Sequence, residues 1–278
     1  MEGTFAGHSQ EILEAMRIRQ EVDAEIQSLY QDRDINDCAG FLLPSLKPNM
    51  KLLDCGCGPG QLSSHFAKIL SSGSVTGIDA NPQHVELAKK ESLSQALSNT
   101  TFHHGDIYQL PFEDNHFDIA FFHTVICNLH DPIAALQEVK RVVKPGGMIA
   151  AREPDYHNSI IYPIYPDVFK GLTALGQAQT GYSDATIGRR LKQIFNSIGL
   201  KSPSISASCD TYSTLLEMKK ICSYLKAQLL AKEVSKTILE RGYLSLEQLE
   251  KSCEAFDKLA ANSDAIYTYT LIEAIGIV

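Results

Sequence analysis

Apolar runs and helix-like stretches alternate along most of the chain. Lys51 to Cys55 is a short apolar run that ends in a glycine-rich turn, and Gly60 to Leu70 follows with its apolar residues at helical spacing. The order recurs at Ser74 to Ala80, where the next helical pattern has Asn81 as an N-cap and Pro82 at its first position. Strands are predicted at 51–55, 74–80, 99–106, 116–125, 148–155, 200–212 and 265–278, and helices at 60–70, 81–97, 131–143 and 183–198.

This alternation decides the fold class. A parallel strand pair needs a crossover connection, usually a helix, so strands that alternate with helices build a parallel sheet. The run at 116–125 is apolar enough to be covered on both faces, which is typical of the central strands of such sheets. The sequence therefore predicts an α/β fold with helices on both faces of a mostly parallel sheet.

Three segments do not follow the alternation and are predicted to be helical insertions. They span about 9–32, 157–181 and 213–262. We expect them to form a cap over the carboxyl ends of the strands, where open α/β sheets bind ligands. The predicted organisation is a single domain over 1–278, whose core takes in about 40–155, 183–212 and 265–278.

Composition narrows the classes of function. The chain has 278 residues, 44% of them hydrophobic, which supports a substantial core. Its formal net charge of -8 argues against nucleic-acid binding and against broad contact with an anionic membrane. The seven cysteines are an odd number without a C-x-x-C pair, and neither a signal peptide nor an apolar run of about 18 residues is apparent. We expect a cytoplasmic protein without membrane insertion, as a monomer or homodimer.

The glycine turn is the first candidate for chemistry. Dinucleotide-binding turns read G-x-G-x-x-G, but counting from Gly56 or Gly58 puts a glutamine or a serine where the third glycine belongs. Asp54 ends the strand just before the turn, and its carboxylate would repel a phosphate by about 4 kcal/mol at roughly 4 Å and an effective dielectric of 20. The same carboxylate would attract a cation, so the turn favours a positively charged ligand.

Acidic residues also end the next two predicted strands. Asp79 stands where a carboxylate can accept both hydroxyls of a ribose, and no basic residue follows it to meet a 2′-phosphate. Asp106 follows the third strand, where it could receive the exocyclic amine of adenine while Ile107 packs on the base. A nucleoside with a sulfonium, an ammonium and no phosphates meets these requirements, which indicates S-adenosylmethionine.

Four motifs carry a resemblance to a known family. "LLDCGCGPG", "VTGIDANP", "GDIYQLPFEDNHFDIAF" and "EVKRVVKPGGMIAAREP" resemble, in order and spacing, those of class I S-adenosylmethionine-dependent methyltransferases, particularly the ubiquinone and menaquinone biosynthesis type. The resemblance implies a Rossmann-like sheet of seven strands whose last strand is antiparallel. It also implies that the backbone around His123 meets the ammonium group and that polar residues near Tyr30 and Arg33 close over the cofactor. For Arg33 the alternative is a surface salt bridge. The expected cofactor-binding residues are Tyr30, Arg33, Asp54, Gly56, Cys57, Gly58, Gly60, Asp79, Ala80, Asp106, Ile107 and His123.

Candidate catalytic residues follow the fourth and fifth strands. His130 is either a general base, because an imidazole titrates near neutral pH, or a packing residue before the next helix. Glu153, Asp155 and Tyr156 are expected to point toward the mouth of the site, with Arg152 neutralising the acidic pair. The candidate catalytic residues are His130, Asp155 and Tyr156.

No metal site is expected. Cys55 and Cys57 lie inside the turn without partner ligands, and neighbouring histidines on a strand point to opposite faces.

The function that these features predict is methyl transfer by in-line displacement to a small, largely apolar acceptor under the cap. The chain has "HTVICN" after the fourth strand, where enzymes that methylate amino groups of bases or glutamine carry an "NPPY"-type signature, so macromolecular acceptors are less favoured. One alternative is a protein that uses S-adenosylmethionine for a non-methylating reaction or as a sensor. Another is a non-catalytic interaction protein on the same fold, against which the three acidic residues speak.

Overall fold

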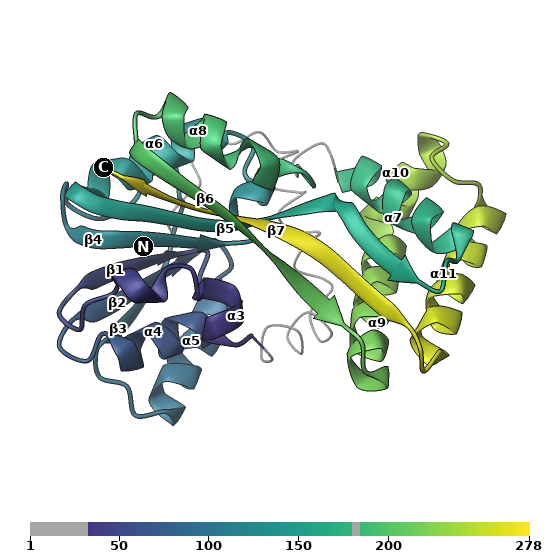
Figure 1. Ribbon diagram of the computed structural model, residues 1–278, viewed down its shortest axis with the longest axis horizontal. Helices are drawn as coiled ribbons and strands as arrows, with labels where there is room; N and C mark the ends of the chain where they lie inside the picture. Colours follow the sequence, from purple (N-terminus) through teal and green to yellow (C-terminus); the bar gives the residue numbers. More distant parts are fainter. Residues whose placement is uncertain (1–32, 180–183) are drawn as a thin grey trace.

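A seven-stranded sheet forms the centre of the molecule. The computed structural model describes residues 33–179 and 184–278. Within them the strand order is β3-β2-β1-β4-β5-β7-β6 (Figure 1), and β7 runs antiparallel to both of its neighbours. The Rossmann-like α/β fold and the antiparallel last strand are thereby confirmed. The strands are β1 Lys51–Cys55, β2 Ser74–Asp79, β3 Thr100–His104, β4 Phe117–His123, β5 Val143–Tyr162, β6 Lys201–Tyr212 and β7 Ile266–Ile277.

Helices cover both faces of the central strands. On β4, Ile119 and Phe121 pack with residues of α3 and α4, whereas Ala120 and Phe122 pack with residues of α6 and α8. This alternation explains why the whole strand is apolar, since successive side chains face opposite layers. Asn81 caps its helix as predicted, because its side chain accepts a hydrogen bond from Gln83 N. These helices are α3 Ile35–Ala39, α4 Gln61–Ile69, α5 Pro82–Ser94, α6 Pro132–Val142 and α8 Leu191–Ser197.

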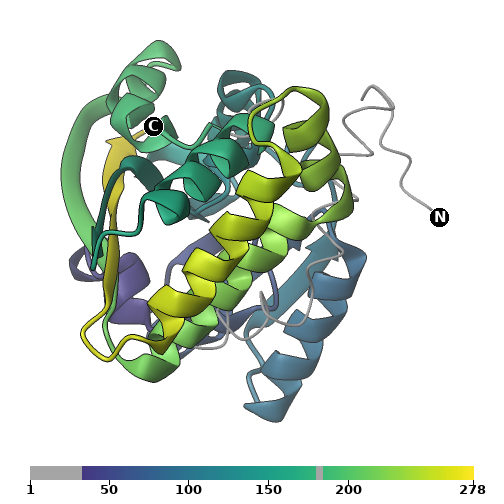
Figure 2. The same cartoon turned by 90° about the vertical axis from the view of Figure 1, so that its right-hand side faces the viewer.

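The second half of the sheet extends beyond the ends of β1 to β4. β5 is 20 residues long, and its second part runs past those ends. There β7 pairs with β5, and β6 pairs with β7 (Figure 1). Helices from two inserted segments pack on the extension around Leu271 of β7 and form a second apolar cluster (Figure 2). We call these helices the cap: α7 Pro166–Gln179, α9 Leu215–Leu230, α10 Lys232–Glu240 and α11 Leu246–Ala261.

Two predicted boundaries were wrong. The insertion expected from residue 157 begins later, because Ile160 to Tyr162 pair with β7 and so continue β5. The helix expected over 183–198 is α-helical only at Leu191–Ser197, after a 3-10 turn at Ile187–Arg190. The helix predicted at 9–32 lies outside the described residues.

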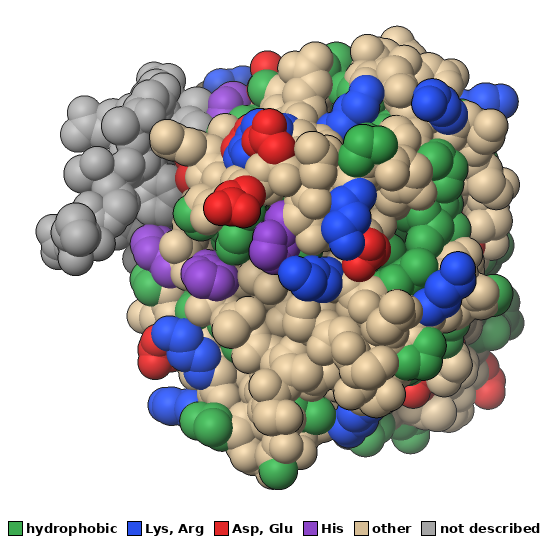
Figure 3. All heavy atoms as spheres, turned by 90° about the vertical axis from the view of Figure 1, so that its left-hand side faces the viewer, with side chains coloured by type: hydrophobic (Ala, Val, Ile, Leu, Met, Phe, Trp, Pro, Cys, Tyr) green, Lys and Arg blue, Asp and Glu red, His purple; other side chains and the backbone are tan. Residues whose placement is uncertain are grey.

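The surface opposite the cap carries mixed charges. Figure 3 shows basic and acidic side chains interspersed on this face. Ion pairs near the amino ends of β4 and β5 join Arg141 to Asp114 and Lys144 to Asp118. In the part of the chain that the structure describes, no helix is both long and apolar enough to cross a membrane.

Candidate functional site

Three left-handed glycines shape the turn after β1. Gly56, Gly58 and Gly60 have φ of 70°, 53° and 87°, a region that strongly favours glycine. A Cβ on Gly56 would lie 2.5 Å from Val125, and one on Gly60 would lie 2.7 Å from Ala88, whereas one on Gly58 would meet no atom within 4 Å. Gly56 and Gly60 are therefore needed for packing, while Gly58 borders open space.

Asp54 lies under this turn. Its carboxyl is 3% exposed and accepts a hydrogen bond of 2.5 Å from Ser63 Oγ. Burial raises the pKa of Asp54 to about 6, although the Ser63 bond opposes the change. A pocket opens beside this carboxyl and is lined by Arg33, Asp54, Gly56, Cys57, Pro59, Gln61, Leu62 and His123.

Asp79 joins the end of β2 to the glycine turn. Its Oδ2 accepts a hydrogen bond of 2.8 Å from Gly58 N, and its Oδ1 accepts one of 2.8 Å from Asn81 N. His84 Nδ1 lies 3.5 Å from Oδ1. The carboxylate is thus fixed at the backbone N–H of Gly58, and the carbonyl of Ala80 beside it contacts His104 Nε2 at 3.1 Å.

Asp106 lies in the turn that follows β3. Gly105 N donates to the carbonyl of Asp79 at 3.1 Å, which holds the ends of β2 and β3 side by side. Asp106 Oδ1 accepts a hydrogen bond of 3.0 Å from Tyr108 N, and Ile107 packs against the apolar cluster under α6. The three acidic residues therefore end three neighbouring strands, in the order expected.

Arg33 and His123 form the other side of the pocket. Arg33 Nη2 donates to Thr124 Oγ1 at 3.2 Å, and that hydroxyl donates to the carbonyl of His123 at 2.7 Å. His123 is 7% exposed. Burial, with the nearby charges of Arg33 and Arg152, lowers the pKa of His123 well below its usual value, so the imidazole is neutral at pH 7. Tyr30, predicted beside Arg33, lies outside the described residues.

Glu153 supports the loop after β4 and was misplaced by the sequence reasoning. It is fully buried, and it accepts hydrogen bonds from three backbone N–H groups, at 2.9 Å from Val125, 2.8 Å from Ile126 and 3.0 Å from Cys127. It does not point toward the mouth of the site. The available signal was a glutamate inside an apolar strand, since buried carboxylates need partners of this kind.

Comparison with known proteins decides the family. A family model described as "Methyltransferase domain" matches residues 46–226. The chain belongs to this methyltransferase family. It is 38% identical over 148 residues to an uncharacterized methyltransferase of Schizosaccharomyces pombe, covering 51% of this chain and 53% of that protein. It is 38% identical over 131 residues to a demethylmenaquinone methyltransferase of Staphylococcus aureus, covering 47% and 51%. The chain thus matches about half the length of these curated relatives.

Solved methyltransferase structures share the fold. A putative methyltransferase from Bacillus halodurans superposes with a TM-score of 0.60 at 16% identity, covering 87% of this chain and 98% of that one. A Haemonchus contortus phosphoethanolamine N-methyltransferase, solved with S-adenosylhomocysteine, gives a TM-score of 0.50 at 15% identity, covering 95% and 52%.

The three predicted catalytic residues have different surroundings in the structure. Asp155 is buried and held by Arg189, whose Nε and Nη2 donate to its two oxygens at 2.8 and 2.6 Å. Tyr156 is 42% exposed, with its ring 4.9 Å from that of Tyr269. His130 is exposed and packs on the ring of Tyr108 at 4.4 Å. Catalytic roles for these residues stay predictions, and the ion pair argues against Asp155 as a free base.

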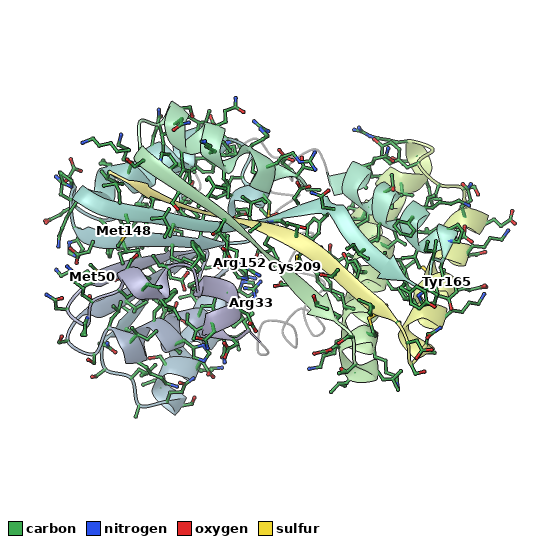
Figure 4. All side chains as sticks on the ribbon, in the orientation of Figure 1. Arg33, Met50, Met148, Arg152, Tyr165 and Cys209 are labelled. Carbon is green, nitrogen blue, oxygen red and sulfur yellow. The ribbon has the colours of Figure 1, made fainter. Side chains whose placement is uncertain are left out.

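Arg152 makes contacts that the sequence reasoning did not anticipate. It does not neutralise the residues that follow it in β5. Its side chain instead reaches β6, where Nη2 donates to Asp210 Oδ1 at 2.7 Å and Nε donates to Ser208 Oγ at 3.0 Å. Figure 4 places Arg152 close to Arg33, where the core meets the sheet extension. Arg152 is thus a buried cation on the strand next to His123, which lines the pocket.

Proposed function

We propose that the protein transfers a methyl group from S-adenosylmethionine to a small-molecule acceptor. The observation that carries the proposal is the pocket at the glycine turn, which Asp54 lines, with the Asp79 carboxylate hydrogen-bonded to Gly58 N of the same turn. Membership of the methyltransferase family supports the reaction class. In the sheet order, Asp54 and Asp79 end adjacent strands, so both carboxylates serve one site.

The residues present fit S-adenosylmethionine. Its ribose would lie by Asp79 and Ala80, its adenine by Asp106 and Ile107, and its methionine part by the turn from Gly56 to Gly60. Among residues 33–179 and 184–278, Arg33 is the cation that lines the pocket, and it would pair with the methionine carboxylate. Asp54 would face the positive charges of the ammonium and the sulfonium. A nucleotide diphosphate would instead meet two carboxylates, which disfavours it.

Positioning and exclusion of water are the main tasks of the chain. S-adenosylmethionine supplies a methyl group that is already activated by the positive charge of its sulfur. Correct placement of an acceptor can supply about 7 to 11 kcal/mol of barrier lowering. The cap helices flank the sheet extension beyond the pocket and would enclose a small acceptor there. A protein base is needed only for an acceptor that loses a proton, and His130 and Tyr156 remain candidates.

Transfer of a labelled methyl group tests the proposal. The protein is incubated with methyl-labelled S-adenosylmethionine and a small-molecule extract of the source organism, and products are identified by mass. We expect one compound to gain label and the mass of one CH₂. Asp79→Asn should abolish labelling by weakening cofactor binding, while Glu86→Gln, an exposed carboxyl on α5, should leave it unchanged.

A product that forms without label would contradict methyl transfer. It would favour the non-methylating alternative, in which the bound cofactor only steers a reaction.

A further inference from the structure

A row of polar side chains crosses the sheet where β4 ends. His123, Arg152, Glu273 and Ser206 are register partners on β4, β5, β7 and β6. Register partners on neighbouring strands project from the same face of a sheet. This is the face on which Phe121 and Ala150, two residues earlier on β4 and β5, pack with α3 and α4. The polar row therefore continues that face toward the cap.

Two nitrogen atoms in this row are buried without a hydrogen-bond partner among the residues that the structure describes. Arg152 is 1% exposed, and its Nη1 has no partner although Nε and Nη2 both donate hydrogen bonds. The Nδ1 atom of the buried His123 has none either. Buried polar groups are almost always hydrogen-bonded in native proteins. The two exceptions lie on register partners of adjacent strands, so one ligand atom would serve both.

The Arg152 guanidinium is held rigidly in place. Asp210 Oδ1 lies 2.7 Å from Nη2, and Glu273 Oε1 lies 3.7 Å from Nε. Tyr269 donates to the second oxygen of Asp210 at 3.0 Å, which orients that carboxylate. Ser206 Oγ in turn donates to Glu273 Oε2 at 2.6 Å. A side chain fixed in this way can present a free N–H group without a large entropic cost.

The row connects the donor pocket with an aromatic wall. His123 itself lines the pocket together with Arg33 and Asp54. On the other side of Arg152, the rings of Tyr212 and Tyr269 lie with their centroids 6.4 Å apart. An acceptor in this position would have its polar group at Arg152 and an apolar body along the tyrosines.

We propose that an oxygen of the methyl acceptor binds between Arg152 Nη1 and His123 Nδ1, so that the acceptor is a compound with a carboxylate or carbonyl group. The inference rests on the proposed function, because it takes the adjoining pocket as the site of the methyl donor. The guanidinium offers only N–H donors, which match an oxygen acceptor. An ammonium group has no lone pair to accept a hydrogen bond, so at this place it would leave Nη1 unpaired.

Three probes of one shape and different charge test the proposal. Benzoate, acetophenone and benzylammonium are titrated by ligand-observed NMR into the wild-type protein saturated with S-adenosylhomocysteine. We expect benzoate and acetophenone to bind and benzylammonium to bind at least tenfold more weakly. Equal binding of the three, tighter binding of the ammonium, or no binding by any of them would overturn the proposal.

Variants then assign the effect to the guanidinium. Arg152→Gln should remove the preference for benzoate over benzylammonium. Arg152→Lys, which keeps the charge, should retain part of this preference. Arg141→Gln, at the amino end of the sheet, is the matched control and should keep the full preference. Unchanged discrimination in a folded Arg152→Gln protein would contradict the assignment.

The wild-type comparison does not depend on the folding of any variant. Failure of S-adenosylhomocysteine itself to bind would count against the proposed function. If S-adenosylhomocysteine binds but the three probes bind equally, only the inference about the acceptor is contradicted.

Discussion

Alanine at Gly58 tests whether the open space beside this residue holds the cofactor. Comparison with alanine at two other left-handed glycines separates that effect from backbone strain. Gly58, Gly60 and Gly146 all have positive φ, at 53°, 87° and 80°. A Cβ on Gly60 would lie 2.7 Å from Ala88, whereas one on Gly58 or Gly146 would meet no protein atom within 4 Å. The three alanine variants therefore have the same free-energy cost of a left-handed backbone. They differ in the atoms that the added methyl group contacts.

The expected magnitudes follow from these contacts. The left-handed conformation costs an L-residue about 1 to 2 kcal/mol, which is the whole penalty expected for Gly58→Ala and Gly146→Ala. Gly60→Ala adds the strain of overpacking, typically about 1 to 3 kcal/mol, for a total of about 2 to 5 kcal/mol. Only at Gly58 does the methyl group enter the space assigned to the cofactor, so we expect a loss of at least tenfold in affinity for S-adenosylhomocysteine.

Urea unfolding with and without ligand measures both quantities. At a ligand concentration about 100 times its Kd, the wild-type protein should gain about 2.7 kcal/mol of unfolding free energy. A tenfold weaker Kd reduces the gain to about 1.4 kcal/mol for Gly58→Ala, while Gly146→Ala should keep the full gain. An unchanged ligand-induced gain in Gly58→Ala would refute the assignment of this open space to the cofactor.

Two further predictions concern buried carboxyl groups. Burial raises the pKa of Asp54 from 3.8 to about 6, so its protonated form favours the folded state. The contribution of Asp54 to the free energy of unfolding should therefore fall by about 2 kcal/mol as the pH rises from 4 to above 6. His123, whose pKa is lowered, has the opposite pH dependence in both proteins, so the fall is measured as the difference in free energy of unfolding between the wild-type protein and Asp54→Asn at several pH values. An equal pH dependence of the two proteins would contradict it. Glu153→Gln replaces a carboxylate that accepts three backbone N–H bonds, so we expect a loss of about 2 to 4 kcal/mol in urea unfolding at pH 7, against less than about 0.5 for the exposed Glu86→Gln. A Glu153→Gln protein as stable as the wild type would show that the loop does not depend on this charge.

Much of the sheet was predictable because its signals are local. The apolar alternation of Ile119 to Phe122 and the cap at Asn81 act within a few residues, and the structure bears both out. The continuation of β5 to Tyr162 was missed because those residues are partly exposed and are held by pairing with β7, about a hundred residues later in the chain. Pairing over such a separation leaves no local pattern.

The candidate site also has parts that local sequence predicts and parts that depend on distant segments. The glycine turn and the acids at the ends of adjacent strands follow one another in motifs that can be read directly from the sequence. The partners of Arg152 and Glu153 could not be predicted from the sequence. Asp210 and the loop N–H groups are distant from them along the chain, and strand pairing brings them together. Adjacent residues of β5 face opposite sides, so their neighbouring charges do not neutralise each other as the sequence suggested.

Calorimetric titration of the purified protein with S-adenosylhomocysteine, NAD and ATP tests the central claim most directly. A crevice with the Asp54 and Asp79 carboxylates at the glycine turn should bind the sulfur compound and reject both phosphate-bearing nucleotides. Tight binding of NAD or ATP with no heat from S-adenosylhomocysteine would contradict the account.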